Sequence, residues 1–209
     1  MRGLVGRARG PTVTEPDKTA LVFIECQRGV IGDFSVLPAL AEAAQPVLAG
    51  MGRLAAGARN SGVLVAHLTY LPAGGGRSTN RRSPLMRATM ATAEWSESHP
   101  AAEVVPEIGV GPDDLVLPRH QGISPVHRTE TLAILRNMGI EEVVVAGVST
   151  NLAIPLVAVG AADEDFAVTI PTDACIGTPP EHHASMLKNG LAFVARLTTV
   201  GDLLAEWTA

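Results

Sequence analysis

Apolar runs rich in β-branched residues alternate with helical segments along this chain, and this alternation constrains the fold more than any other feature. The runs TALVFIEC (residues 19–26) and EEVVVAGV (141–148) are apolar over most of their length on both faces. Such runs are typical of parallel strands that are covered on both sides. Right-handed crossovers between them place helices on both faces of the sheet. The sequence therefore predicts a three-layer α/β/α sandwich with a six-stranded, mostly parallel sheet.

The predicted elements follow from runs of this kind and from helical patterns between turn residues. Pro46 is expected to kink or break the first long helix, and Gly62 lies where its C-terminal cap belongs. Residues 72–84 are predicted to form a mobile loop, and residues 91–109 to form short helical turns. The predicted strands are residues 19–26, 62–70, 113–119, 141–148, 166–174 and 193–200, and the predicted helices are residues 37–62, 129–140, 151–165, 180–192 and 201–209.

Length and charge narrow the class of protein. The 209 residues suit one domain, which we place at residues 18–209, after a flexible leader at residues 1–17 that alternatively serves as a basic partner arm. The net charge of −5, without a basic stripe, speaks against nucleic-acid and membrane partners. No apolar run is long enough to span a membrane, and a cytoplasmic location is expected. We expect no metal and no other cofactor, since His182 and His183 are adjacent on a predicted helix and face different ways.

Polar residues at strand ends predict where a ligand binds. In open parallel sheets, ligands bind beyond the carboxyl ends of the strands, where the strand order reverses. Glu25 ends the first predicted strand, Arg119 and His120 end the third, and Ser149 begins a polar turn after the fourth. The order 3-2-1-4-5-6, expected for this fold class, brings Glu25 beside that turn.

The turn after the fourth strand carries a family resemblance. It reads Gly-Val-Ser-Thr-Asn-Leu-Ala over residues 147–153. This resembles the nucleophile segment of the isochorismatase-like (cysteine hydrolase) superfamily, which runs roughly Gly-Val-x-Thr-x-x-Cys-Val. The context Glu25-Cys26-Gln27 is similar to the family's Asp-x-Gln, and Arg119 occupies the place of a family lysine. The resemblance covers roughly residues 18–200 and implies the isochorismatase-like fold.

All three catalytic positions depart from the family pattern: Glu25 replaces Asp, Arg119 replaces Lys and Ala153 replaces Cys. In the family, the thiolate attacks an amide carbonyl, the Asp acts as base and the Lys gives electrostatic support. The methyl group of Ala153 cannot be a nucleophile, so thiol chemistry at this position is excluded. The resemblance also implies a cis peptide near Val148–Ser149 and assembly into homodimers or homotetramers.

The leading hypothesis is an isochorismatase-like hydrolase that works without a thiol on a small-molecule substrate. Isochorismatases cleave a vinyl ether by protonation and water attack, using the acidic residue. Glu25 would supply the acid/base chemistry, and Arg119 would hold a substrate carboxylate. The alternative for both residues is a structural ion pair. A tight pair would stabilise the ionised carboxylate of Glu25, which argues against an acid role.

Two other hypotheses remain open. The first is an inactive binding or assembly module on the same fold, because fold alone does not grant activity. The second is a different nucleophile: Ser149, Thr150 or Cys175, which we expect to be more open than Cys26. We expect Cys26 to pack in the core.

The remaining candidate residues are substrate contacts, each with a structural alternative. Thr150 or Asn151 is the expected cap of the following helix, whose free N–H groups near residues 152–154 would hold a carbonyl oxygen. His120 either lines the pocket or points to the surface, and His67 is a site residue or a buried histidine with its own partner. The candidate substrate-binding set is His120, Ser149, Thr150, Asn151, Gln27 and His67.

Overall fold

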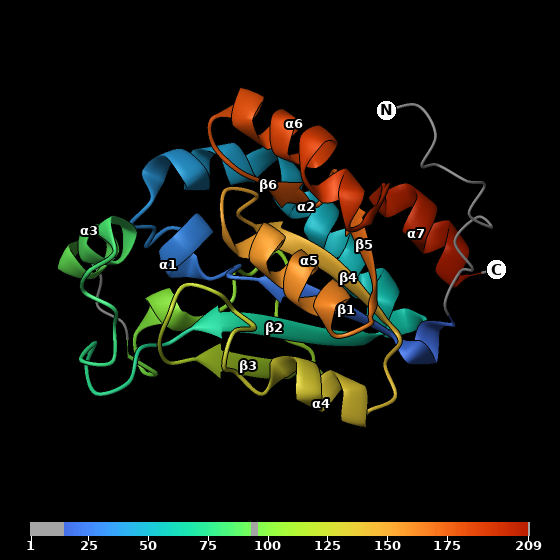
Figure 1. Cartoon of the computed structure of the whole chain (residues 1–209), viewed down its shortest axis with the longest axis horizontal. Coiled ribbons are helices and arrows are strands. Elements are labelled where there is room, and N and C mark those ends of the chain that lie inside the picture. The colour runs from blue at the N-terminus through green and yellow to red at the C-terminus, as the bar shows by residue number, and fades with distance from the viewer. Residues whose placement is uncertain (1–14, 93–95, 209) are drawn as a thin grey trace.

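The apolar runs form the strands of one parallel sheet in the computed structural model, which describes residues 15–92 and 96–208 (Figure 1). The strand order is β3-β2-β1-β4-β5-β7, so the predicted order is confirmed along the main path of the sheet. An unpredicted strand of two residues, β6, pairs with β4 and is too short to show a pattern in the sequence. The strands are β1 (Thr19–Ile24), β2 (Leu64–Tyr70), β3 (Leu115–Arg119), β4 (Glu142–Val148), β5 (Ala167–Pro171), β6 (Cys175–Ile176) and β7 (Arg196–Thr198).

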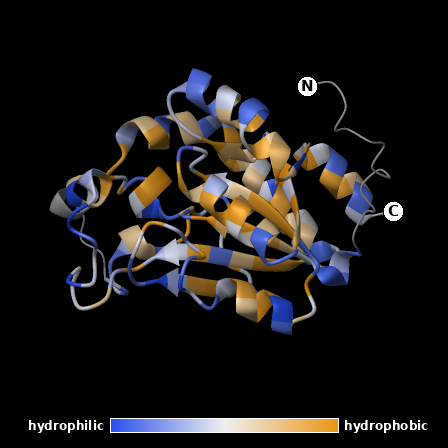
Figure 2. Cartoon of the chain, in the orientation of Figure 1, coloured by the Kyte–Doolittle hydropathy of each residue, from blue (hydrophilic) through white to orange (hydrophobic). Residues whose placement is uncertain are grey.

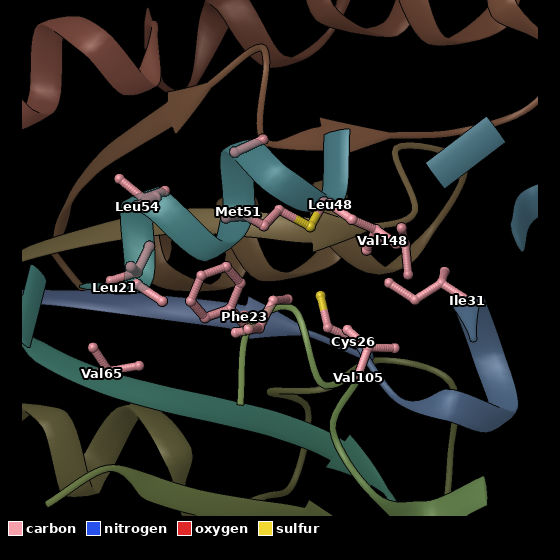
Figure 3. Packing of buried hydrophobic residues seen from close by; sticks show 14 of the residues in the cluster. Leu21, Phe23, Cys26, Ile31, Leu48, Met51, Leu54, Val65, Val105 and Val148 are labelled. Carbon is pink, nitrogen blue, oxygen red and sulfur yellow. The ribbon is translucent and has the colours of Figure 1, made fainter. Parts of the chain in front are cut away.

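Side chains of β1 alternate between two hydrophobic clusters, because successive residues of a strand point to opposite faces. Leu21 and Phe23 pack in one cluster with α2 (Pro38–Asn60) and α7 (Val200–Trp207), as Figure 3 shows for part of it. Ala20 and Val22 pack in the other with α4 (Thr131–Asn137) and α5 (Ala153–Asp163). Full burial of one large apolar side chain contributes about 1.5–3 kcal/mol. The three predicted layers are therefore held together by both faces of one strand.

The helix α2 continues through Pro46, so the expected break at this residue is wrong. Proline removes the hydrogen bond to the carbonyl four residues earlier, here that of Glu42. Both residues are exposed, so water can satisfy that carbonyl. Burial of the opposite face, which includes Leu48 and Met51, holds the helix together (Figure 3). Gly62 follows the helix end with a φ of +78°, as its capping role requires.

Several shorter elements complete the chain. Among them, the helix α6 (Pro180–Asn189) has no buried residue and shows several hydrophilic residues in Figure 2. The helix α3 (Pro84–Thr92) was not assigned from the sequence, where its residues fall partly in the predicted loop, partly in the predicted turns and otherwise between the two. Residues 1–14 of the expected leader lie outside the described part of the chain. No helix among the described residues is both long and apolar enough to span a membrane. The remaining elements are η1 (Pro16–Lys18), α1 (Arg28–Ile31), α3 (Pro84–Thr92), η2 (Pro100–Ala102), α6 (Pro180–Asn189) and η3 (Leu191–Phe193).

Candidate active site

Glu25 follows β1 directly and lies at the carboxyl edge of the sheet. Its backbone N–H donates to the carbonyl of Leu68 on β2 at 2.9 Å, and its φ is +52°. A non-glycine residue in this left-handed region is uncommon, and such residues cluster at functional sites. The side chain is 18% exposed, and its Oε1 accepts a hydrogen bond from Nη1 of Arg119. The backbone thus turns this carboxylate out of the strand and toward its partner.

Arg119 is the last residue of β3 and is held on several sides. Its Nη1 is paired with Glu25, and its Nε donates to the carbonyl of Gly122 at 3.3 Å. The guanidinium carbon lies 4.6 Å from the centre of the Tyr70 ring, a cation–π contact. The side chain is only 6% exposed. The structure therefore brings Glu25 and Arg119 together as the ion pair that the sequence left open.

The turn after β4 leads into α5 with a cis peptide between Val148 and Ser149, as the resemblance implied. The helix begins at Ala153, and its cap is Leu152, without a side-chain hydrogen bond. The expectation that Thr150 or Asn151 caps it is therefore wrong. Among the described residues, the N–H groups of Asn151 and Ala153 have no hydrogen-bond acceptor. These two donors are free to bind a carbonyl oxygen or an anion.

A cavity of about 390 Å³ opens where these segments meet. Apolar side chains from residues 30–40, from α3 and from the segment after β3 form most of its wall. This position, between β1 and β4, is where the strand order reverses, as the sequence predicted. Its charged and polar lining residues are Glu25, Arg119, Ser149, Asn151 and Thr178, and Ala153 lines it as well.

Two predicted substrate contacts, Thr150 and Gln27, lie behind the cavity wall. Thr150 is fully buried, and its hydroxyl lies 3.0 Å from Nδ1 of His183 on α6. Gln27 is also fully buried. Its Nε2 donates to the carbonyls of Tyr70 and Ala102, at 3.1 and 3.0 Å, and its Oε1 accepts the Tyr70 N–H at 2.7 Å. Both side chains tie neighbouring segments together and do not line the cavity.

The two predicted histidines also lie outside the cavity lining. His67 lies in the middle of β2, and its Nε2 is 2.8 Å from Oδ2 of Asp114. Burial lowers the pKa of His67, although Asp114 opposes that shift. His120 is exposed, and its Nδ1 lies 2.7 Å from the carbonyl of Leu71. His67 is thus a buried histidine with a partner of its own, and His120 points to the surface; these are the alternatives to a role in substrate binding.

Both cysteines are buried. Cys26 packs in the cluster beneath α2, as predicted (Figure 3). Cys175 lies in β6 with no exposed surface, so the expectation that it is more open is wrong. Burial raises the pKa of the Cys175 thiol to about 12. Pairing of β6 with β4, which the sequence did not reveal, places this residue in the hydrophobic cluster that contains residues of α4 and α5.

Sequence reasoning missed the apolar part of the site. Leu85 and Met86 of α3 line the cavity, as does Ile123, whereas no residue of the loop at 72–83 does. A 2.9 Å hydrogen bond between the Tyr70 and Thr79 hydroxyls connects that loop to the end of β2. A helical pattern starting at Pro84 was the available signal for α3. Within the described residues, no three His, Cys, Asp or Glu side chains form a group that could hold a metal ion.

Comparisons with known proteins point to one family. A family model described as "Isochorismatase domain" matches residues 19–202. The uncharacterized isochorismatase family protein YecD of Escherichia coli O157:H7 is 28% identical over 193 residues, which cover 89% of this chain and 94% of YecD. The ureidoacrylate amidohydrolase RutB of Enterobacter sp. strain 638 is 27% identical over 167 residues, or 70% of each chain. The crystal structure of a cysteine hydrolase from Pseudomonas syringae pv. phaseolicola 1448A superposes with a TM-score of 0.81 at 18% identity, covering 94% of this chain and 95% of that one.

Proposed function

This chain belongs to the isochorismatase family, whose domain matches residues 19–202, and we propose that it is a hydrolase that acts on a small molecule without a thiol nucleophile. The observation that carries this proposal is the meeting of Glu25, Arg119 and Ala153 at one cavity. A carboxylate, a cation and free backbone donors at the strand ends are the groups that hydrolysis requires. The relatives include an amidohydrolase, which supports the same reaction class.

The contact with Arg119 supports one of the two acid/base roles considered for Glu25. Arg119 donates to Oε1 of Glu25, so the carboxylate already serves as a hydrogen-bond acceptor. A carboxylate that accepts hydrogen bonds can take a proton from water, and this supports the role of general base. Only Oε1 is bonded to Arg119. The other oxygen, Oε2, is left to accept a proton from water.

In the proposed mechanism, Glu25 takes a proton from a water molecule as its oxygen attacks the carbonyl carbon of the substrate. The N–H groups of Asn151 and Ala153 bind the oxyanion that forms. The intermediate then collapses, the bond to the leaving group breaks, and the leaving group takes the proton from Glu25. The methyl group of Ala153 leaves space at the start of α5, where the family places its thiol.

A second candidate function is binding without turnover. The closed Glu25–Arg119 pair and the mostly apolar wall favour it, because neither feature requires a reaction. The pair does not seal the cavity, however, since both residues line it. Consumption of the ligand separates the two candidates.

The test is a hydrolysis panel of isochorismate-type vinyl ethers, small primary amides, N-carbamoyl compounds and esters. Wild type is compared with Glu25→Gln, which keeps the shape of the side chain and removes its basicity. We expect Glu25→Gln to lose turnover by a factor of about 10² or more. Glu42→Gln, an exposed carboxylate on α2 outside the cavity, is the matched control and should retain full activity. Turnover that survives in Glu25→Gln would remove Glu25 from the mechanism, and no turnover in wild type would favour the binding module.

A further inference from the structure

The charge lining the cavity points to the class of molecule that it takes. Among the described lining residues, Glu25 and Arg119 are the only two with charged side chains, and they pair with each other. The exposed fractions are 18% for Glu25 and 6% for Arg119, so the negative member is the more accessible one. An anionic ligand would therefore meet a like charge before it met the guanidinium.

The donors of Arg119 are also largely engaged. A carboxylate is gripped by two neighbouring N–H groups of a guanidinium, either Nη1 with Nη2 or Nε with Nη2. Nη1 already donates to Glu25 and Nε to the carbonyl of Gly122, so one nitrogen of each pair already has an acceptor. One face of the guanidinium lies against Tyr70. A substrate carboxylate would have to displace these contacts, which argues against the carboxylate clamp expected from the sequence.

The rest of the cavity suits an apolar body with one polar head. Leu37, Leu40 and Met86 are part of its apolar wall. Ser149 and Asn151 lie on the turn after β4, where neutral hydrogen-bonding groups gather. A carbonyl or amide head can be satisfied there, whereas an unpaired charge would be buried at high cost.

We propose that the cavity takes an uncharged ligand with an apolar body and a single carbonyl-type head. If the ligand is a substrate, this proposal rests on the proposed function. The proposal about binding alone does not require turnover. The turn after β4 would hold the head, and the wall formed by residues 30–40 and α3 would cover the body. Amides and esters of apolar acids are the compounds of this class.

The test uses three probes that share one body and differ in the charge of the head: 3-phenylpropanamide, 3-phenylpropanoate and 3-phenylpropylamine. Their affinities for the wild-type chain are measured by ligand-observed NMR. We expect the amide to bind at least about tenfold more tightly than either charged probe. Equal or tighter binding of the carboxylate or the amine, or no binding of the amide at its solubility limit, overturns the proposal.

A cation added to the cavity wall provides an independent check. Leu85 lines the cavity and is 36% exposed, so Leu85→Arg is tolerable and adds an unpaired guanidinium. We expect this variant to bind the carboxylate more tightly than wild type does, by about tenfold. Ala88→Arg adds the same charge to an exposed position of α3 outside the lining and should leave the preference unchanged. An unaltered preference in Leu85→Arg would also overturn the proposal.

The same NMR samples separate this inference from the proposed function. Hydrolysis of the amide appears as new signals of the acid, independently of affinity. Tight binding of the amide without hydrolysis supports the ligand class and counts against hydrolysis of that probe. Hydrolysis of a charged substrate combined with weak amide binding supports the hydrolase and overturns the ligand class.

Discussion

The hydroxyl of Thr150 lies 3.0 Å from Nδ1 of His183, and this contact fastens the turn after β4 to helix α6. Beside it, the side-chain oxygen of Asn151 accepts the N–H of Thr178 at 3.0 Å. Both donors that we assign to the oxyanion lie on this turn or directly after it. Their position therefore depends on the segment 176–183, whose contacts with the turn span 27 and 33 residues of the chain.

Gly177→Ala should loosen this attachment. A Cβ at residue 177 would lie 2.2 Å from Oγ1 of Thr150 and 2.6 Å from Oδ1 of Asn151, so the turn would have to move. We expect a loss of about 1–3 kcal/mol in the free energy of unfolding and a lower turnover number, measured by urea denaturation and by the assay above. Gly201→Ala, in α7, meets only Oγ1 of Thr199 at 3.8 Å and should not lower stability. Equal effects of the two changes would show that the turn is not held by this contact.

The buried pair of His67 and Asp114 should make stability depend on pH. Burial lowers the pKa of His67 in the folded state, and the nearby Arg59 adds to this shift, although Asp114 opposes it. The unfolded chain therefore binds more protons as the pH falls below about 6.5, and stability falls with it by at most about 1.4 kcal/mol per pH unit. His67→Phe should reduce the dependence of the free energy of unfolding on pH, as measured by urea titrations at pH values between about 5 and 8. Histidine side chains usually titrate in this range. The exposed His127→Gln is the control, and an unchanged slope in His67→Phe would exclude His67 as its origin.

Asp114 should contribute a second pH-dependent term at lower pH. Burial alone would raise the pKa of its carboxyl. Hydrogen bonds from Arg59, from the N–H of Gly111 and from His67 outweigh this and hold the pKa at about 2. The stabilisation is present above the ordinary value of about 3.8 and is lost as the pH falls toward 2. Asp114→Asn should remove the acid-induced loss in this window, as followed by circular dichroism, and should lower stability at neutral pH.

Neither native cysteine should react with a thiol reagent while the chain is folded. Cys26 and Cys175 are 3% and 0% exposed, and burial raises the pKa of both thiols. We expect no colour from Ellman's reagent in native buffer and two equivalents after denaturation, since only an accessible thiolate reacts. Rapid reaction of one native thiol would instead restore Cys175 as a candidate nucleophile.

Ala153→Cys should create one reactive thiol at the cavity. Residue 153 begins α5, and the positive end of a helix lowers the pKa of a thiol placed there. We expect one equivalent of iodoacetamide to label the variant, with peptide mapping to place it at residue 153. Addition of a tightly bound ligand should slow the labelling. No labelling of the folded variant would show that the cavity does not open at this residue.

Much of the fold was predictable because strands buried on both faces carry a strong local signal. β1 and β4 have few polar residues. The ends of β1, β3 and β4 were placed correctly enough to bring Glu25, Arg119 and Ser149 to one edge. The two-residue β6 gave no such signal, and its absence from the prediction led directly to the wrong exposure of Cys175.

The site was less predictable because tertiary partners decide which polar side chains face the ligand. Thr150 lies between two lining residues in sequence, and Gln27 lies two residues from Glu25, yet each turns toward partners behind the wall. The Nε2 of His67 is paired with Asp114, which precedes a different strand. These partners are 33 to 75 residues apart in the chain, and no periodic pattern encodes such contacts.

The cavity wall draws on four stretches of the chain: residues 25–40, 85–86, 119–123 and 149–178. No one of them forms a container by itself, so the binding site should exist only when all four are in place. Occupancy by a ligand then reports on the cooperativity of the whole domain, and its loss in denaturant should coincide with global unfolding. A ligand that binds weakly in the cavity can therefore report how much of the chain is folded. Such a ligand also works in crude mixtures, where other proteins obscure the spectroscopic signal of this chain.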